Sequence, residues 1–336
     1  MTIVFAILLF LILVFIHEFG HFAAAKLCDI KVNQFAVGMG PALFKKQKGD
    51  TEYSLRLIPI GGYCAMEGED EETEDPRGFN NKPARSKAFV VAAGPLMNFI
   101  LAFVIMCIIV YSVGTATTAI GSFVDGSLAP EAGLKEGDRI VMIDDVKIDE
   151  WNDVSKALED AKAGETVKVT VNRDGEEITE DIKLFESEGR AMIGITPALE
   201  RHVGSAIKDG FKSTLSLTKM MYAVIKQLFT GEVPASELSG PVGIVYIVNQ
   251  SLSQGLMYFF YLLAMLSLNL AVINLLPFPA LDGGRLLFIV IRKITGEAIS
   301  DSLEGKINLI GIVLLFALMI FVTGNDIIKF VLPMFK

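Results

Sequence analysis

The sequence predicts a polytopic α-helical membrane protein with about four membrane-spanning helices, a membrane-associated β-hairpin loop and an inserted α+β domain. Hydrophobic residues make up 52% of the 336 residues, and the mean hydropathy is +0.49, as in integral membrane proteins. Long apolar stretches alternate with charged segments along the chain. One charged segment, residues 115–186, has the strand and helix periodicity of a small folded domain.

Composition also limits the function. The net charge is −9 and the isoelectric point is about 5.0, and no basic stripe is present, so nucleic acid is not an expected partner. The three cysteines have no pairing or metal-site spacing and predict no disulfide framework. No glycine-rich phosphate loop or dinucleotide-binding fingerprint occurs in the sequence.

The first expected span covers residues 1–25, which at ~1.5 Å per residue can cross a ~30 Å hydrocarbon core. No Lys or Arg precedes Lys26, so the basic region of a secretory signal peptide is missing. Basic residues follow the span instead, at Lys26, Lys31, Lys45, Lys46 and Lys48. By the positive-inside rule, the N-terminus is outside the cell and residue 26 is cytoplasmic.

Residues 26–87 are expected to form a cytoplasmic loop with a β-hairpin. A turn signal at Gly38–Pro41 precedes a partly alternating run. The acidic run Glu67–Asp75 predicts a solvated surface loop.

Residues 88–113 form the second expected span and return the chain to the outside. Residues 1–114 therefore make up an N-terminal membrane part.

The segment 115–186 is expected to be an extracytoplasmic domain. An alternating strand comes first, Trp151 to Ala161 has helical spacing, and Asp174-Gly175 is a hairpin turn between two strands. A linker at residues 187–254 follows. It contains an amphipathic helix at 206–229, which can either lie on a membrane surface or pack on the protein.

The C-terminal membrane part, residues 255–336, contains the last two expected spans, at 255–276 and 307–325. Between them, Pro277–Gly284 cannot continue a helix. Broken backbone at membrane depth is tolerated where it is buried in protein or lines a cavity. The break therefore indicates a buried or cavity-lining loop at this position.

The first span carries the strongest chemical signal, His17-Glu18-Phe19-Gly20-His21. Residues four apart lie on one face of a helix, so His17 and His21 can present both imidazoles to one cation. Glu18 is then placed to act on a metal-activated water. The fifteen residues before Ile16 carry no charge, and polar residues in such a span are costly unless they serve a function.

A catalytic zinc site needs a third protein ligand. His202 follows the extracytoplasmic domain and is therefore a poor candidate. Asp282 is expected at the cytoplasmic end of its span, at a depth similar to that of the two histidines. It can equally be the polar residue of an Asp-Gly turn, so the spacing alone leaves both roles open.

Together, these motifs resemble those of the bacterial site-2 proteases, intramembrane zinc metalloproteases of the RseP/RasP type. The resemblance covers nearly the whole chain. It rests on His17-Glu18-x-x-His21, Gly38-x-Gly-Pro41, the Y-x-x-x-x-x-P-x-G-G-Y segment at 53–63, Ala93-Gly-Pro-x-x-Asn98, Ser239-Gly-Pro-Val-Gly243 and the segment Asn274 to Gly283. Residues 115–186, with A-G-L-x-x-G-D-x-I at 132–140, also resemble a PDZ domain.

The family resemblance implies a role for six residues and one Zn²⁺ per chain. The implied zinc ligands are His17, His21 and Asp282, the implied catalytic base is Glu18, and the residues implied to hold the substrate or its oxyanion are Asn274 and Asn269. The family's hairpin is thought to pair with an unwound substrate.

The expected function is zinc-dependent cleavage, by metal-activated water attack, of single-span proteins in the bacterial cytoplasmic membrane. Cleavage follows an earlier extracytoplasmic cut, and the expected substrates are an anti-sigma factor or remnant signal peptides. The expected partners are this transmembrane substrate, a peptide or protein ligand of the PDZ-like domain, and the lipid bilayer.

Two features depart from the family pattern. Only one PDZ-like domain is present, and Arg285 stands where some relatives have histidine. Arg285 is interpreted as a snorkelling or topology charge, and no catalytic role is assigned to it. Two other functions remain as alternatives: an intramembrane metal or ion transporter, and a PDZ-tethered membrane scaffold with a vestigial metal site. The intact Glu18 and the absence of an internal repeat favour the protease.

Overall fold

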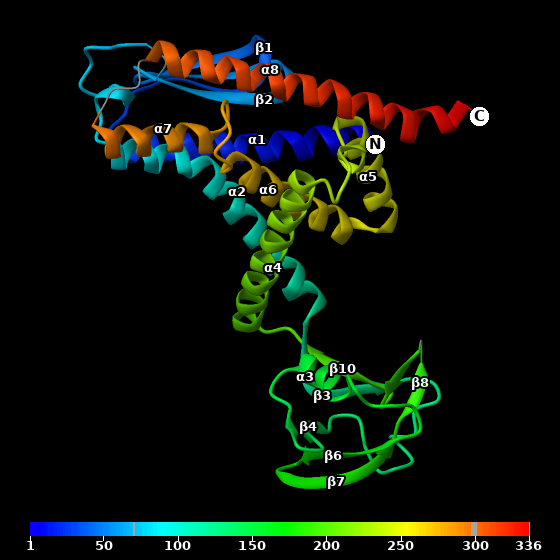
Figure 1. Ribbon diagram of the computed structural model, residues 1–336. Helices are drawn as coiled ribbons and strands as arrows, with labels where there is room; N and C mark the ends of the chain where they lie inside the picture. Colours follow the sequence, from blue (N-terminus) through cyan, green and yellow to red (C-terminus); the bar gives the residue numbers. More distant parts are fainter. Residues whose placement is uncertain (70, 188, 297–300, 336) are drawn as a thin grey trace. The chain divides into compact units, whose positions relative to one another are not determined.

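A computed structural model describes residues 1–69, 71–187, 189–296 and 301–335. The chain forms two compact units, which we call the membrane unit (Met1–Ile109 and Gly210–Lys336) and the inserted unit (Val110–Asp209) (Figure 1). Four helices of the described residues are long and apolar enough to span a membrane, which confirms the predicted number of spans. They are Thr2–Leu27, Ala84–Val113, Leu256–Asn274 and Leu303–Phe330.

The membrane unit is mainly helical. Its helices are α1 (Thr2–Leu27), α2 (Ala84–Val113), α4 (Val203–Thr230), α5 (Pro241–Gln254), α6 (Leu256–Asn274), α7 (Asp282–Thr295) and α8 (Asp301–Asp326), with short helical turns at Phe79–Asn81, Ala235–Glu237, Ile327–Val331 and Leu332–Phe335. Residues of α1, α2, α5 and α6 share one apolar core, in which Leu9, Ala102 and Leu268 are fully buried. The first two spans and the third are therefore packed together around a common centre.

The predicted β-hairpin is present, as β1 (Val32–Lys48) and β2 (Thr51–Met66). It is more folded than a simple hairpin, because residues 34–37 pair both with 52–55 and with 62–65. Each long strand is thus bent into two segments, and the sheet has more ladder contacts than its two strands would make if they were straight.

Glycines permit these bends. Gly38 and Gly61 have φ angles of 85° and 82°, a region that residues with a Cβ atom rarely adopt. The end of β2 then lies beside α1, where a Cβ atom on Gly62 would be 3.4 Å from Cγ of Glu18. The fold therefore brings the edge of a sheet to the motif in the first span.

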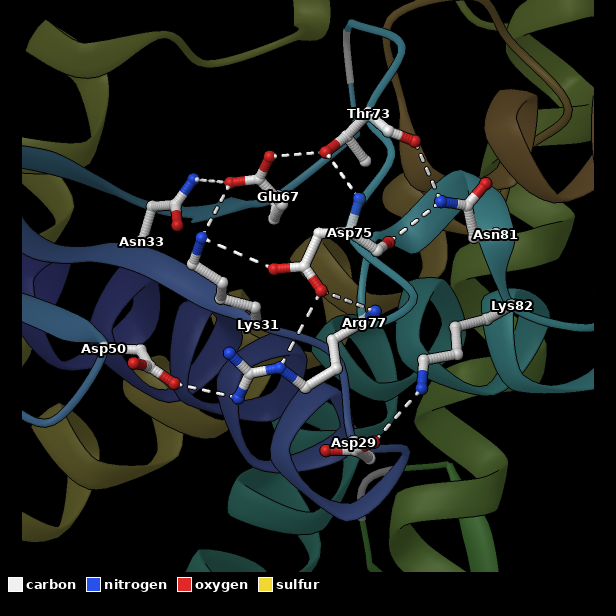
Figure 2. Close-up of polar contacts among 10 residues, drawn as sticks. All are labelled: Asp29, Lys31, Asn33, Asp50, Glu67, Thr73, Asp75, Arg77, Asn81 and Lys82. Atoms are coloured by element: carbon white, nitrogen blue, oxygen red, sulfur yellow. Dashed lines mark hydrogen bonds and ion pairs between the residues drawn. The ribbon is translucent and has the colours of Figure 1, made fainter.

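The acidic run Glu67–Asp75 is only in part the solvated loop that the sequence predicted, because Glu71, Glu72 and Glu74 are exposed but Glu67 is held by neighbouring side chains. Glu67 accepts hydrogen bonds from Asn33 at 2.9 Å, Thr73 at 2.8 Å and Lys31 at 3.3 Å (Figure 2). The hydrogen bonds from Asn33, Thr73 and Lys31 lower the pKa of the Glu67 carboxyl to about 2. For Glu67 the prediction was wrong, because Asn33 and Lys31, which are distant in the sequence, tie this residue to the base of the hairpin.

The amphipathic helix predicted at 206–229 is α4, and one of its faces packs on α2. A Cβ atom on Gly210 would lie 2.7 Å from the Cys107 sulfur, and the rings of Phe211 and Phe103 meet edge to face at 6.0 Å. Of the two alternatives that the sequence left open, packing on the protein therefore holds for this face.

Helix α5 was not predicted. It begins at Pro241, a position where the missing N–H of proline costs nothing. Asp326, fully buried at the end of α8, accepts the backbone N–H groups of Gly240 and Gly243 at 2.9 and 2.8 Å. A carboxylate satisfies the unpaired donors at a helix N-terminus and is favoured there by the helix dipole. This contact joins α5 to α8.

Between α2 and α4, the described residues of the inserted unit form a six-stranded sheet, a short helix and a two-stranded ribbon. Its elements are β3 (Thr115–Phe123), β4 (Arg139–Ile143), β5 (Val146–Lys147), α3 (Trp151–Ala157), β6 (Thr166–Arg173), β7 (Glu176–Lys183), β8 (Phe185–Ser187), β9 (Arg190–Met192) and β10 (Ile195–Glu200). The sheet order is β10-β3-β4-β6-β7, with β5 paired to β4. The predicted helix is present but ends at Ala157 rather than Ala161. The hairpin is confirmed, and β10 adds a strand from beyond residue 186.

We expect Asp138→Asn to destabilise the inserted unit by about 2 kcal/mol. The Asp138 side chain is 2% exposed, and Arg173 donates to its two oxygens at 2.7 Å each. Arg173 holds the pKa of this carboxyl below its ordinary value. The stabilisation is complete above the ordinary pKa of about 3.9 and is lost as the pH falls through the lowered pKa of the folded state.

Trp151 allows this effect to be measured in the full chain. It is the one tryptophan of the sequence and packs against the core of the inserted unit, so its fluorescence follows the unfolding of that unit. Glu177→Gln removes a carboxylate from an exposed position of β7 and is the control. Equal midpoints for the two variants would contradict a stabilising role of the Asp138 pair.

Candidate metal centre

The H-E-x-x-H segment lies in α1 and directs both imidazoles to one point. His17 and His21 are 8% and 9% exposed, and their Nε2 atoms are 3.2 Å apart. The close approach of α2 encloses them. A Cβ atom on Gly20 would lie 2.3 Å from the Ala93 carbonyl oxygen, and one on Gly94 would lie 2.3 Å from His21 Nε2. Both positions therefore require glycine in this packing.

Asp282 joins the two histidines from a distant part of the chain. It is the first residue of α7, directly after the proline-containing break. Its Oδ2 lies 3.2 Å from His17 Nε2 and 3.6 Å from His21 Nε2. A Cβ atom on Gly283 would be 2.2 Å from the Leu276 carbonyl oxygen. Glycine at this position thus lets α7 begin close against the loop that precedes it.

The three side chains fit a zinc ion. Their ligand atoms all lie within 4.8 Å of one another. Tetrahedral zinc with bonds of about 2.0–2.1 Å places neighbouring ligand atoms roughly 3.3–3.4 Å apart, close to the 3.2, 3.2 and 3.6 Å between these atoms. Asp282 Oδ2 is buried and has no hydrogen-bond partner within the described residues, an arrangement that a cation would make favourable.

Partners on the other ring nitrogens hold the imidazoles in orientation. His21 Nδ1 is 2.9 Å from the Val90 carbonyl oxygen, and His17 Nδ1 is 3.3 Å from Asn98 Nδ2. A histidine that binds metal through Nε2 donates its Nδ1 proton. We therefore assign the Asn98 amide so that Oδ1, which otherwise has no partner among the described atoms, accepts this proton.

Asn98 ends the Ala93-Gly-Pro-x-x-Asn98 segment of the family resemblance, but no site role was predicted for it. It is fully buried, and the Ser267 hydroxyl of α6 donates to the backbone carbonyl oxygen of Asn98 at 2.8 Å. Its signal was a polar side chain within the uncharged span 88–113, where such residues make functional or interhelical contacts.

The structure places the other predicted residues as follows. Glu18 is half-buried in α1, next to His17 and outside the group of three ligand atoms. Asn274 Nδ2 is 3.4 Å from His17 Nε2. Asn269 is exposed on α6 and lies on a different face of that helix from Asn274, so its role stays a prediction. His202 belongs to the inserted unit.

Comparison with known proteins agrees with this chemistry. The chain matches peptidase family M50 over residues 5–318. A protein of Clostridium acetobutylicum, named as a candidate zinc metalloprotease, is 39% identical over 97% of this chain and 97% of its own length. The regulator of sigma-W protease RasP of Bacillus subtilis is 32% identical over 97% of this chain and 98% of the relative. The zinc metalloprotease RasP of Geobacillus kaustophilus is 31% identical over 97% of each. The chain therefore belongs to peptidase family M50 and is a zinc metalloprotease of the site-2 protease type.

Proposed function

We propose that the protein hydrolyses a peptide bond within single-span membrane proteins, with His17, His21 and Asp282 as the zinc ligands. The observation that carries this proposal is the position of the ligand cluster. Two of its members lie in α1, a helix apolar enough to span a membrane. A hydrolytic site at that depth acts on substrates that are themselves embedded in the bilayer.

The proposed orientation places the N-terminus and the inserted unit outside the bacterial cytoplasmic membrane and the active site towards its cytoplasmic side. Support comes from the basic residues, since Lys26 lies in the last turn of α1, and Arg292 and Lys293 lie in the last turn of α7. Positively charged residues favour the cytoplasmic side.

In the proposed mechanism, the bound zinc ion supplies polarisation of the scissile carbonyl and lowers the pKa of water. Glu18 takes the proton of the attacking water and later delivers it to the leaving amine. Its half-buried position beside the two histidines suits both transfers. Asn274 donates an amide N–H to the developing oxyanion. Asn98 and Val90 hold the imidazoles in place throughout.

A substrate helix must unwind before its carbonyl can be attacked, and its exposed backbone groups then need partners. We propose that they pair with the 62–66 segment of β2. Within the described residues, this segment pairs only with 32–37, so its other edge carries no strand. Gly62 lies beside Glu18, which places a peptide on this edge next to the proposed base.

We further propose that the inserted unit is a PDZ-like domain that binds a peptide or protein ligand along a strand edge. Its role is to exclude substrates with a long extracytoplasmic part, so that cleavage follows an earlier cut. Candidate substrates are an anti-sigma factor or remnant signal peptides. The name of the Bacillus subtilis relative, a regulator of sigma-W, agrees with the first class.

The proposal is tested with the purified full chain in detergent and a tagged single-span test protein. We expect cleavage within the membrane segment that a chelator stops and added zinc restores. Metal uptake by proteoliposomes without any cleavage would instead indicate a transporter. Zinc binding with neither uptake nor cleavage would indicate a scaffold, and both results would contradict the proposal.

Asn274→Ala is expected to lower kcat about 100-fold, because it removes one donor to the oxyanion, while the zinc content stays unchanged. The comparison is Asn269→Ala, on another face of α6, for which we expect a change in KM alone. Steady-state cleavage of the tagged substrate measures both constants. A kcat of Asn274→Ala equal to that of the wild type would remove this residue from the proposed mechanism.

A further inference from the structure

An ion pair joins the helix of the metal centre to the loop that follows the hairpin. Arg285, one turn beyond Asp282 on α7, donates to Oε1 of Glu69. The side chains of Arg285 and Glu69 are 35% and 13% exposed. The pair is thus partly shielded from solvent, which strengthens its attraction relative to that of an exposed pair.

Asp282 needs such an anchor. Its Oδ2 accepts no hydrogen bond within the described residues and faces only the two imidazoles. The position of the carboxylate is therefore set by α7. This helix packs through Leu286 and Ile289 against an apolar core that includes Val90. Apolar packing is not directional, whereas an ion pair to a fixed partner favours one rotation of the helix about its axis.

Glu69 is such a fixed partner. Its Oε2 accepts the backbone N–H of Met66, the last residue of β2, at 3.3 Å. The neighbouring Glu67 is held by Lys31 and Thr73 in the network at the base of the hairpin (Figure 2). Glu69 thus extends from the strand whose edge is proposed to bind the substrate.

The pair borders a cavity of about 170 Å³ that other charged side chains also line, namely Lys87, Arg292 and Glu304. Arg292 contacts Glu304, so two arginine–glutamate contacts of α7 border the same cavity. Comparison of the two separates the effect of the Glu69–Arg285 contact from a general effect of charge in this cavity.

We propose that Glu69 and Arg285 are positioning residues of the metal centre. Their ion pair fixes α7 so that Asp282 faces the two imidazoles, and it ties this residue to the strand beside Glu18. The inference rests on the proposed role of Asp282 as a zinc ligand, and it gives Arg285 a structural partner in place of the snorkelling or topological role that the sequence suggested.

The test is a double-mutant cycle on the full-length protein in detergent. Wild type, Glu69→Gln, Arg285→Gln and the double variant are titrated with Co²⁺ against a competing chelator, and the absorption bands of bound Co²⁺ report the ligand geometry. We expect Glu69→Gln and Arg285→Gln each to weaken Co²⁺ binding about tenfold. The double variant should bind Co²⁺ no more weakly than either single variant. Cleavage should show a lower kcat with KM unchanged.

Glu304→Gln is the matched control. It breaks the contact of Arg292 with Glu304, a second arginine–glutamate pair of α7, at 2.5 Å, and it should leave Co²⁺ binding unchanged. Wild-type affinity in Glu69→Gln, or effects of the single variants that simply add in the double variant, would overturn the inference alone. A wild-type chain that binds no Co²⁺ would overturn the ligand assignment, and this inference with it.

Discussion

Glu18→Gln is expected to reduce cleavage of a membrane substrate about 10³-fold without loss of zinc. Glutamine preserves the size of the side chain but cannot take a proton from water. Glu18 lies outside the group of three ligand atoms, so its replacement removes no donor from the metal. Cleavage rates and the zinc content of the purified protein, measured on the same sample, separate the two effects.

Asp282→Asn is the comparison, because it alters a member of the ligand group. It should lose zinc and activity together. A Glu18→Gln protein that cleaves at the wild-type rate would remove Glu18 from the mechanism, and one that loses its zinc would make Glu18 part of the metal site. In cells, membrane fragments that accumulate with Glu18→Gln would identify the natural substrates.

The spans and the H-E-x-x-H motif could be predicted because their signals are local. The run without charges at 88–113 and the spacing of His17 and His21 are properties of single segments. The turn at Gly38–Pro41 likewise predicted the hairpin. Each of these features follows from periodicity or turn chemistry within about thirty residues.

The contact between Asp282 and the two histidines was harder to predict from the sequence. Hydropathy placed the three residues at similar depth, but the spacing of Asp282 also fitted a turn, and the family resemblance decided between these roles. The structure adds the physical reason: α7 begins at Asp282, close against the broken loop. Helix α7 itself was not predicted, because it is short and amphipathic and follows a proline-containing segment.

What could not be predicted depends on pairing between distant segments. Asn98 contacts His17 only because α1 and α2 pack in one register. Glu67 and Glu69 were taken for solvated residues because their partners, Asn33 and Arg285, are remote in sequence. Patterns within one segment carry no information about such partners, since these are selected by tertiary packing.

Gly94→Ala is expected to weaken zinc binding by tenfold or more, in the range of roughly 10–100-fold found when groups that orient metal ligands are altered. The residue is not a ligand. Its added Cβ atom would lie 2.3 Å from His21 Nε2 and 2.9 Å from His17 Cε1, distances that real contacts do not reach. Either both imidazoles must turn away or α2 must retreat.

A retreat of α2 does not rescue the site. The same helix supplies Val90 to His21 and Asn98 to His17, so movement of its backbone separates both rings from the groups that orient them. A movement of α2 that relieves the clash therefore also disturbs the orientation of both imidazole rings. The affinity for zinc, measured by competition with a chelator, is expected to fall together with the cleavage rate.

Gly324→Ala provides the control, because a Cβ atom there would meet no atom within 4 Å and the position lies within α8. Alanine favours a helix over glycine by about 1 kcal/mol, so this variant should keep its zinc and be at least as stable as the wild type. Gly94→Ala should receive the same gain in helix propensity. If Gly94→Ala keeps the native helix content, measured by circular dichroism, but loses zinc, the defect lies in the position of the imidazoles. If it binds zinc with wild-type affinity, α1 and α2 are not packed as closely as Gly94 and Gly20 indicate.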